Sequence, residues 1–235
     1  MKSSTKYLLV LSIVPILTSC VAATTAKQQR IDEVPMYGGM DRSSMPELKD
    51  GDEKFISSVT EKFGSREKAS TAWVDQGFKF YKDDQLGMAM RRFNQAWLLD
   101  PENPEVYWGF AAVLTDQEKY CEAANHIDMA FAKGKIQDSA LPDAGIMYSG
   151  CVAVNSGLTE SEKSAYISKT DAVFNEALES PAVSDKYVYF HWSRAMYALK
   201  DWESAWDKVQ KYESSTGETM SSQFKDAIRK NMGNQ

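Results

Sequence analysis

The stretch STAWVDQGFKFYKDDQLGMAMRRFNQAWLLDPEN, residues 70–103, decides the fold of this chain. Its apolar residues recur every three or four positions in two blocks, which is the spacing of amphipathic helices. Charged residues 82–84 separate the blocks, and Pro101 ends the second block because proline cannot continue a helix. The stretch therefore predicts two antiparallel helices joined by a short turn.

The same pattern returns after 34 residues, in a second unit over 104–137. Small residues in the pattern let two helices approach closely, and aromatic residues fill the space around them. The matched positions are Trp73, Gly77, Phe80, Ala89, Phe93 and Ala96 in the first unit and Tyr107, Ala111, Leu114, Ala123, Ile127 and Ala130 in the second. Because one such unit cannot bury its apolar face, the period predicts a stack of helix pairs.

Two less regular units follow. In the third, over about 140–180, Ile146 and Gly150 are predicted to take repeat positions in the first helix. Its second helix, which contains Phe174, follows an inserted stretch. A fourth unit is predicted over about 186–215. No segment shows the convincing alternation of a strand, so the domain is predicted to be all-α.

Numbered from Ser70, the matched residues and Pro101 stand at positions 4, 8, 11, 20, 24, 27 and 32 of the first unit. This set resembles the signature of the tetratricopeptide repeat (TPR). The resemblance implies a TPR-like, right-handed α-solenoid of about three to four helix-turn-helix repeats within a domain over 48–235. A leading helix around Phe55–Phe63 and a terminal helix over about 219–232 are expected to cap the stack.

In the TPR family the first helices of the repeats line a concave groove. By this resemblance the groove residues are Phe78, Tyr81, Lys82, Trp108, Asp116, Met147, Tyr187, Phe190, Arg194 and Tyr197. Aromatic residues and Arg dominate binding hot spots, so a protein or peptide segment is the expected ligand. The alternative for some of these aromatic residues is a place in the core between repeats. Family members that bind a C-terminal carboxylate have Lys at position five and Asn at position nine. This chain has Val74 and Trp108 at position five, and Phe78 and Ala112 at position nine. Recognition of a C-terminal carboxylate is therefore not expected.

The first 19 residues have the organisation of a secretory signal, with a short cationic start and a mostly apolar run over 7–17. This run is too short to span a bilayer, which needs about 20 apolar residues. The sequence LTSC at 17–20 resembles the lipobox of bacterial lipoproteins. The resemblance implies that Cys20 is lipidated and becomes the first mature residue. Val21 after it implies transfer to the outer membrane, facing the periplasm.

Residues 20–47 are predicted to be the lipidated Cys and a flexible tether. Small and polar residues, a glycine pair at 38–39 and the lack of an apolar period support this prediction. The alternative for Met36, Tyr37 and Met40 is a short partner-binding segment.

Charge and motif content exclude several classes of function. The formal net charge is −6, and removal of the first 19 residues leaves 25 basic against 33 acidic side chains. Such a balance disfavours binding to nucleic acid, which requires basic patches. His126 and His191 stand in no metal-ligand spacing, and no phosphate-binding loop or nucleophile motif is present. We therefore expect no metal, no cofactor and no enzymatic activity.

Two cysteines remain after Cys20. Cys121 begins the second helix of the second unit, and Cys151 lies late in the first helix of the third unit. An oxidising compartment permits a disulfide between these adjacent helices, and two buried free thiols are the alternative.

Together these features predict a membrane-anchored periplasmic scaffold or adaptor that binds an envelope protein in its groove, for example in the assembly of a secretion, pilus or envelope complex. The alternative is a receptor for a small ligand or a cell-wall glycan, which an aromatic groove could bind by stacking.

Overall fold

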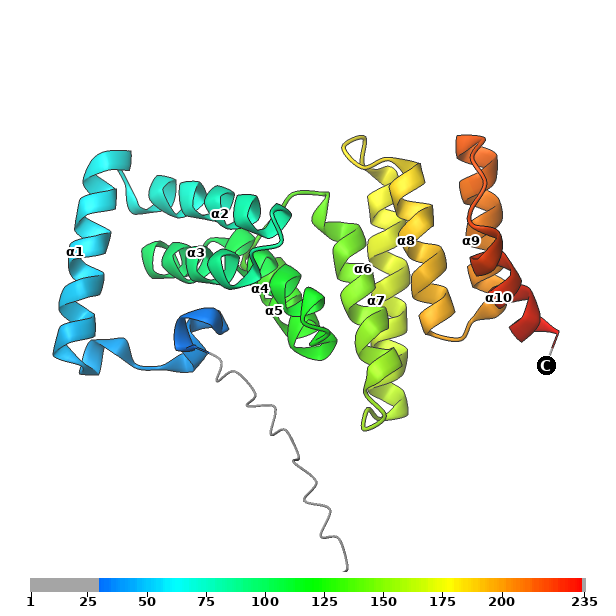
Figure 1. Cartoon of the computed structure of the whole chain (residues 1–235), viewed down its shortest axis with the longest axis horizontal. Coiled ribbons are helices and arrows are strands. Elements are labelled where there is room, and N and C mark those ends of the chain that lie inside the picture. Colours follow the sequence, from blue (N-terminus) through cyan, green and yellow to red (C-terminus); the bar gives the residue numbers. More distant parts are fainter. Residues whose placement is uncertain (1–29, 234–235) are drawn as a thin grey trace, which may run out of the picture.

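The computed structural model describes residues 30–233, and in this range the chain is helical and has no strand. Figure 1 shows the helices following one another along the long axis of the molecule. They are α1 (Pro46–Phe63), α2 (Arg66–Lys82), α3 (Leu86–Leu99), α4 (Pro104–Asp116), α5 (Tyr120–Lys133), α6 (Ala140–Val154), α7 (Glu160–Glu179), α8 (Asp185–Ala198), α9 (Trp202–Thr216) and α10 (Ser222–Met232). The predicted all-α class is confirmed.

The helices pack in sequential pairs, α2 with α3, α4 with α5, α6 with α7 and α8 with α9. The first helices of neighbouring pairs also contact one another, α2 with α4, α4 with α6 and α6 with α8. The second helix of each pair contacts the first helix of the next pair. This arrangement is compatible with an α-solenoid, in which each pair contacts its neighbours.

The joint between the first two pairs depends on one aromatic ring and two glycines. Phe93 of α3 is fully buried between Gly77 of α2 and Gly109 of α4. A Cβ atom on either glycine would lie 2.4 Å from an atom of the Phe93 ring. Since real side chains do not come this close, only glycine allows both helices to pack against the ring.

The third pair makes the same kind of contact between two residues that are further apart in the sequence. Gly145 of α6 packs against the ring of Phe174 in α7, with a hypothetical Cβ again 2.4 Å from the ring. Gly145 stands 34 residues after the position of Ala111, so the strict period continues through α6. The structure thus differs from the predicted placement of Ile146 and Gly150 at the repeat positions. These two residues are only half-buried, whereas Gly145 is buried.

The inserted residues of the third pair extend both of its helices. Gly145 and Phe174 are 29 residues apart, whereas Gly77 and Phe93 are 16 apart. Both α6 and α7 continue further toward their shared turn than α2 and α3 do, and this turn projects beyond the neighbouring pairs at the bottom of Figure 1. The extra length lies where it does not disturb the packing between pairs.

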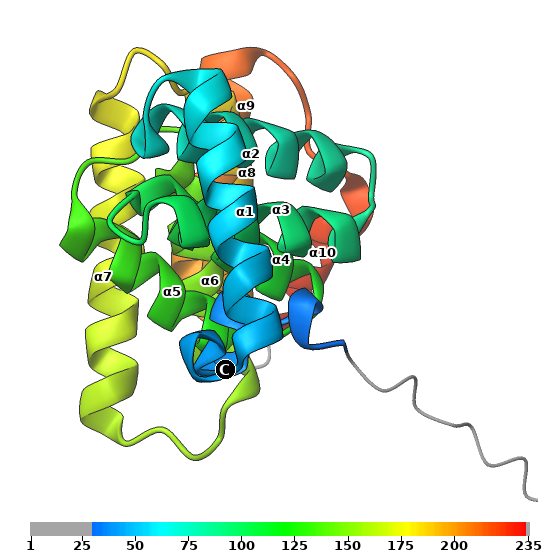
Figure 2. The same cartoon turned by 90° about the vertical axis from the view of Figure 1, so that its left-hand side faces the viewer.

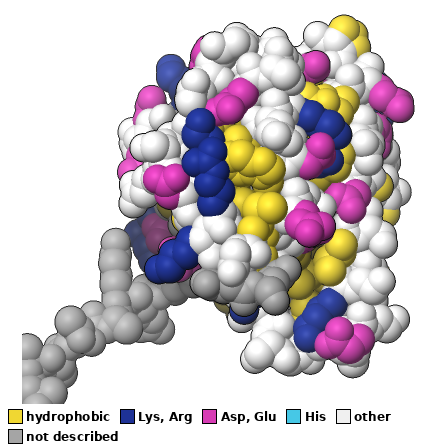
Figure 3. Space-filling model, turned by 90° about the vertical axis from the view of Figure 1, so that its right-hand side faces the viewer, with side chains coloured by type: hydrophobic (Ala, Val, Ile, Leu, Met, Phe, Trp, Pro, Cys, Tyr) yellow, Lys and Arg dark blue, Asp and Glu magenta, His cyan; other side chains and the backbone are white. Residues whose placement is uncertain are grey.

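The two ends of the stack are covered by single helices. The α1 helix crosses the front of the molecule in Figure 2 and ends at Gly64, whose left-handed φ of 84° closes the helix. At the other end α10 packs on α9. Figure 3 shows apolar side chains interspersed with charged ones on this end, and Arg229 of α10 lies 4.6 Å from the centre of the Trp206 ring. Such a mixed surface suits a terminal cap.

Residues 30–45, which we name the N-terminal strap, are packed on the domain. They contain the short 3-10 segments η1 (Ile31–Glu33), η2 (Pro35–Gly39) and η3 (Arg42–Ser44), and Tyr37 in the strap is only 6% exposed. Buried Asn94 of α3 accepts a hydrogen bond from the backbone N–H of Tyr37 and donates to the carbonyl groups of Asp32 and Val34. This part of the predicted tether is therefore a structured contact of the domain, which corrects the flexible tether predicted over residues 20–47.

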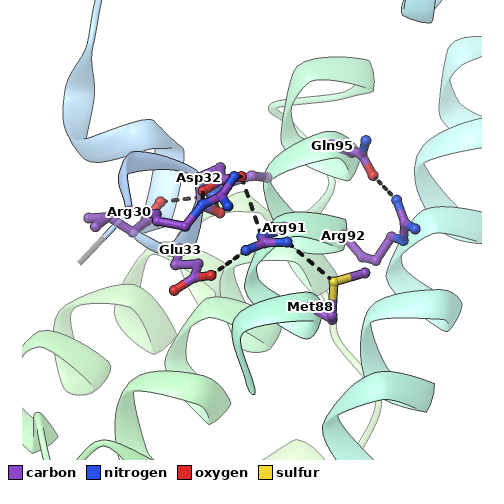
Figure 4. Close-up of polar contacts among 9 residues, drawn as sticks. Arg30, Asp32, Glu33, Met88, Arg91, Arg92 and Gln95 are labelled. Atoms are coloured by element: carbon purple, nitrogen blue, oxygen red, sulfur yellow. Dashed lines mark hydrogen bonds and ion pairs between the residues drawn. The ribbon is translucent and has the colours of Figure 1, made fainter. Parts of the chain in front are cut away.

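Ion pairs add to the contact of the strap. Figure 4 shows Arg91 of α3 between the carboxylates of Asp32 and Glu33, with its Nε atom 3.3 Å from Asp32. Arg42 forms two hydrogen bonds with Asp52 of α1. The strap has no apolar period because one aromatic ring and several polar contacts hold it, which explains why its sequence suggested a tether.

The predicted signal over 1–19 and the predicted lipidation site Cys20 lie outside the described residues. Within residues 30–233, every helix is too short or too polar to cross a bilayer.

Candidate binding groove

A groove with a volume of about 600 Å³ lies along the first helices of the pairs. Its lining residues come mainly from α2, α4, α6 and α8, which contact one another in sequence. We name this surface the groove and define it by Tyr81, Asp116, Asp143, Met147, Tyr187 and Arg194. The groove is continuous over four helix pairs because the first helices of neighbouring pairs contact one another.

Asp143 of α6 is the central polar group of the groove. Its carboxylate accepts a hydrogen bond from the Trp108 indole N–H at 3.1 Å and another from the Tyr187 hydroxyl at 3.4 Å. Shielding from solvent raises the pKa of Asp143 to about 6, the two hydrogen bonds oppose the shift, and the negative charge of Asp116 adds to it. Asp143 is therefore mostly ionised at pH 7 and mostly neutral at pH 5.

Two tyrosines lie beside the groove carboxylates. Burial, together with the nearby carboxylates of Asp116 and Asp143, raises the pKa of Tyr81 well above its ordinary value. Burial and the charge of Asp143 raise the pKa of Tyr187 to about 12. Both hydroxyls therefore stay protonated at neutral pH. Tyr187 also presents an accessible ring, with 41% of the residue exposed.

Two further residues of α8, Arg194 and His191, also line the groove. The Arg194 guanidinium lies 3.6 Å from the centre of the Phe190 ring and 5.1 Å from that of Phe224. His191 packs against Tyr187 and Phe190. Burial, and then the charge of Arg194, lower the pKa of His191 to about 4, so that the ring is neutral at pH 7.

The groove is braced from the side by a disulfide. Cys121 at the start of α5 and Cys151 in α6 are joined, with their Cα atoms 4.5 Å apart. The neighbours of these cysteines, Tyr120 and Gly150, both line the groove, and the Tyr120 ring occupies the space that a Cβ on Gly150 would need. The disulfide therefore holds one wall of the groove at the junction of α5 and α6.

The structure brings together half of the predicted groove residues. Tyr81, Asp116, Met147, Tyr187 and Arg194 line the groove. Phe190 lines a smaller hollow beside it, which shares Tyr187 and His191 with the groove. Lys82 is exposed outside the groove lining.

Of the remaining three predicted residues, Trp108 belongs to the core, and Phe78 and Tyr197 are half-buried and pack against it. Trp108 is only 8% exposed, and its ring centre lies 4.5 Å from that of Phe78. Tyr197 packs against Trp202 of α9 and Phe224 of α10. These rings are at least partly covered because neighbouring helices pack against them, as the core alternative for these aromatic residues anticipated.

The sequence did not predict that Asp143, Ile146 and Tyr120 line the groove. A strict 34-residue period through α6 would have placed Ile146, Ser149 and Gly150 at groove positions nine, twelve and thirteen, and all three line the groove. No pattern in the sequence indicated Asp143, because its place depends on how α6 turns against α4 and α8.

The two histidines pack against aromatic rings. His126 is half-buried beside Tyr107 and Phe110, and its partial burial lowers its pKa to about 4. Among residues 30–233, no three His, Cys, Asp or Glu side chains gather in a way that could hold a metal ion. Comparison of the chain with protein-family models, curated proteins and solved structures finds no match.

Proposed function

We propose that this protein is a TPR-like scaffold that binds a segment of a partner protein in the groove. The observation that supports this function best is the groove itself, which extends over four helix pairs and combines aromatic rings with charged groups. An extended or helical peptide contacts such a surface at several points, and tyrosine and arginine supply most of the binding energy at protein interfaces.

The TPR-like assignment rests on the recurring contact between a glycine and an aromatic ring. Gly77 with Phe93 and Gly145 with Phe174 occupy corresponding places in two helix pairs. Ala89 and Ala96 in α3 and Ala123 and Ala130 in α5 are fully buried, which agrees with small residues at the signature positions.

We further propose that the protein is anchored through lipid on Cys20 to the outer membrane and faces the periplasm. This proposal rests on the sequence of residues 1–21. The disulfide between Cys121 and Cys151 supports it, because structural disulfides persist in oxidising compartments such as the periplasm. The partner is then a protein of the cell envelope.

A crosslinking experiment in intact cells tests the scaffold function. A photoreactive amino acid replaces Tyr187 in the groove, and the control carries it at Lys79, which is exposed on α2 outside the groove lining. We expect one dominant protein adduct from position 187 that is missing from position 79. Equal adducts at both positions, or none at position 187, would reject the scaffold function.

The anchor has its own test. A Cys20→Ala variant should move from the membrane fraction to the soluble periplasmic fraction, because two or three acyl chains are needed for stable attachment. A Cys121→Ala variant is the control for loss of a cysteine and should stay in the membrane fraction.

The second candidate is a glycan receptor, which the exposed ring of Tyr187 beside Asp143 favours. Sugar rings stack on aromatic faces while carboxylates accept hydrogen bonds from their hydroxyl groups. Titration with soluble peptidoglycan fragments, followed by NMR, tests this function. Perturbations confined to residues around Tyr187 and Asp143 would support it over a protein partner, which should perturb the whole groove.

A further inference from the structure

The groove contains more negative than positive charge. Asp116, Glu118 and Asp143 line it, and Arg194 is the one Lys or Arg among the lining residues that the structure describes. Within residues 30–233, no ion pair includes Asp116 or Asp143. Asp143 is held by neutral donors, the Trp108 indole and the Tyr187 hydroxyl, and Asp116 lies near Tyr81.

Arg194 does not neutralise these carboxylates because it is engaged elsewhere. Its guanidinium stacks on Phe190 and lies near Phe224, and neither of these rings lines the groove. The charge that acts on Asp143 in the described structure is a second carboxylate, that of Asp116. An enclosed carboxylate of this kind is stabilised when a cation enters from outside.

The shape and chemistry of this end of the groove fit an amino-acid cation. Carboxylates bind guanidinium and ammonium groups through charge-assisted hydrogen bonds. The rings of Tyr81 and Tyr187 stand beside the carboxylates and can add cation-π attraction. The volume of about 600 Å³ accommodates a long side chain together with part of its backbone.

We propose that the groove binds a basic residue, Lys or Arg, of its partner segment, and that Asp143 and Asp116 receive its positive charge. This inference rests on the proposed scaffold function and specifies the chemistry of the partner. It is the opposite of carboxylate-terminus recognition, which requires a cluster of cations that the described groove does not have.

The pH dependence of binding follows from the groups around Asp143. These are Tyr81 on α2, Asp116 at the end of α4, Glu118 in the turn that follows, and Tyr187, His191 and Arg194 on α8. Between pH 5 and pH 7 the tyrosines stay protonated, His191 stays neutral and Arg194 stays charged, so protons compete with the bound cation mainly at Asp143. Affinity for a basic segment should rise as the pH increases through about 6, by at most tenfold per pH unit.

The probes are two blocked octapeptides that are identical except for a central arginine or citrulline. Citrulline has nearly the same shape as arginine but no charge. Binding to the mature full-length protein is measured by isothermal titration calorimetry at pH 7. We expect the arginine peptide to bind at least tenfold more tightly than the citrulline peptide.

Two variants test whether Asp143 and Asp116 bind the positive charge of the peptide. Asp143→Asn and Asp116→Asn should each reduce the preference for arginine to less than threefold. Glu176→Gln, at an exposed position of α7 away from the groove, makes the same change in net charge and should keep the preference. Because Asp116 is exposed at the end of α4, its variant is informative even if Asp143→Asn disturbs folding.

The outcomes separate this inference from the scaffold function. Equal binding of the two peptides, or no binding of the arginine peptide at millimolar concentration, overturns the inference. So does an adduct at position 187 that persists unchanged in cells when Asp143 and Asp116 are both replaced by Asn, although the scaffold function then stands. Absence of any adduct at position 187 in the otherwise unchanged protein rejects the scaffold function itself.

Discussion

The first and third helix pairs bury an aromatic ring in the same place but connect to the next pair in different ways. Phe93 fills the space above Gly77 in its own pair and above Gly109 in the next one. Phe174 packs on Gly145 in its own pair, but its ring also stacks on Trp192 of α8, with ring centres 5.4 Å apart and an angle of 12°.

This comparison separates two requirements of the stack. Close approach within a pair needs a glycine opposite the ring, and both pairs have one. In the contact with the next pair, the buried ring can pack either on a second glycine or on a second aromatic ring, because both arrangements fill the space between the pairs. The length of the helices is a third property that varies freely, since the extra turns of α6 and α7 project away from both joints.

The largest expected effect is the loss of either ring. Phe93→Ala should lower the free energy of unfolding by about 3–5 kcal/mol, because a cavity opens between α2, α3 and α4. Phe174→Ala should cost less within that range, since Trp192 can move into part of the space. Urea unfolding of both variants measures the difference, and a larger loss for Phe174→Ala would contradict the comparison.

The disulfide joins the second helix pair to the extended third pair, so its removal should have the next largest effect. Replacing Cys121 and Cys151 together by Ser should lower stability by about 3–4 kcal/mol, because the bond closes a loop of 30 residues in the unfolded chain. Thermal unfolding with and without a reducing agent checks this value. The reductant should destabilise the unmodified protein and leave the double variant unchanged.

The second pair should be more sensitive to acid than the third. Burial lowers the pKa of His126 to about 4, and the corresponding residue before Phe174 is Val173. A histidine that stays neutral in the folded state stabilises the protein above its unfolded pKa of about 6.5, and this stability is lost as the pH falls toward 4. The slope per histidine is at most about 1.4 kcal/mol per pH unit.

Urea unfolding at pH 7 and at pH 5 measures this contribution. His126→Val should reduce the stability difference between the two pH values, while His191, whose pKa is also about 4, should maintain part of it. If the stability difference between the two pH values is unchanged in His126→Val, His126 binds its proton as readily in the folded protein as in the unfolded chain.

The smallest expected effect distinguishes a glycine at a joint from a glycine in open space. Gly109→Ala should destabilise the protein by about 1–3 kcal/mol, because the new Cβ meets the Phe93 ring. Gly51→Ala in α1 meets no atom within 4 Å and should stabilise by about 0.5–1 kcal/mol through better helix propensity. Changes of the same sign in both variants, measured by thermal unfolding, would remove the distinction.

Much of the fold could be predicted because helix pairs of this kind depend on local patterns. The spacing of Trp73, Gly77 and Phe80 indicated helix α2, and Pro101 marked the end of α3. The groove was harder to predict, since residues at similar positions on the first helices divide between surface and core. Tyr81 and Tyr187 face the groove, whereas Trp108 is covered by its neighbours.

The N-terminal strap shows the limit of pattern analysis most clearly. Met36 and Tyr37 adopt left-handed backbone angles, with φ values of 50° and 52°, which are unfavourable for residues other than glycine. Burial of the Tyr37 ring and the hydrogen bonds of Asn94 offset this cost. A contact between residues 57 positions apart leaves no periodic signal in either segment.

The sequence by itself determined the all-α class, the pairing of helices and the places where they end, because these follow from the spacing of apolar residues and from glycine and proline. Only the tertiary structure decided which side chains meet in the groove, how Asp143 and Asp116 come to share it, and where the strap lies. Those features depend on the rotation of one helix against another, and that rotation is set by packing over the whole stack.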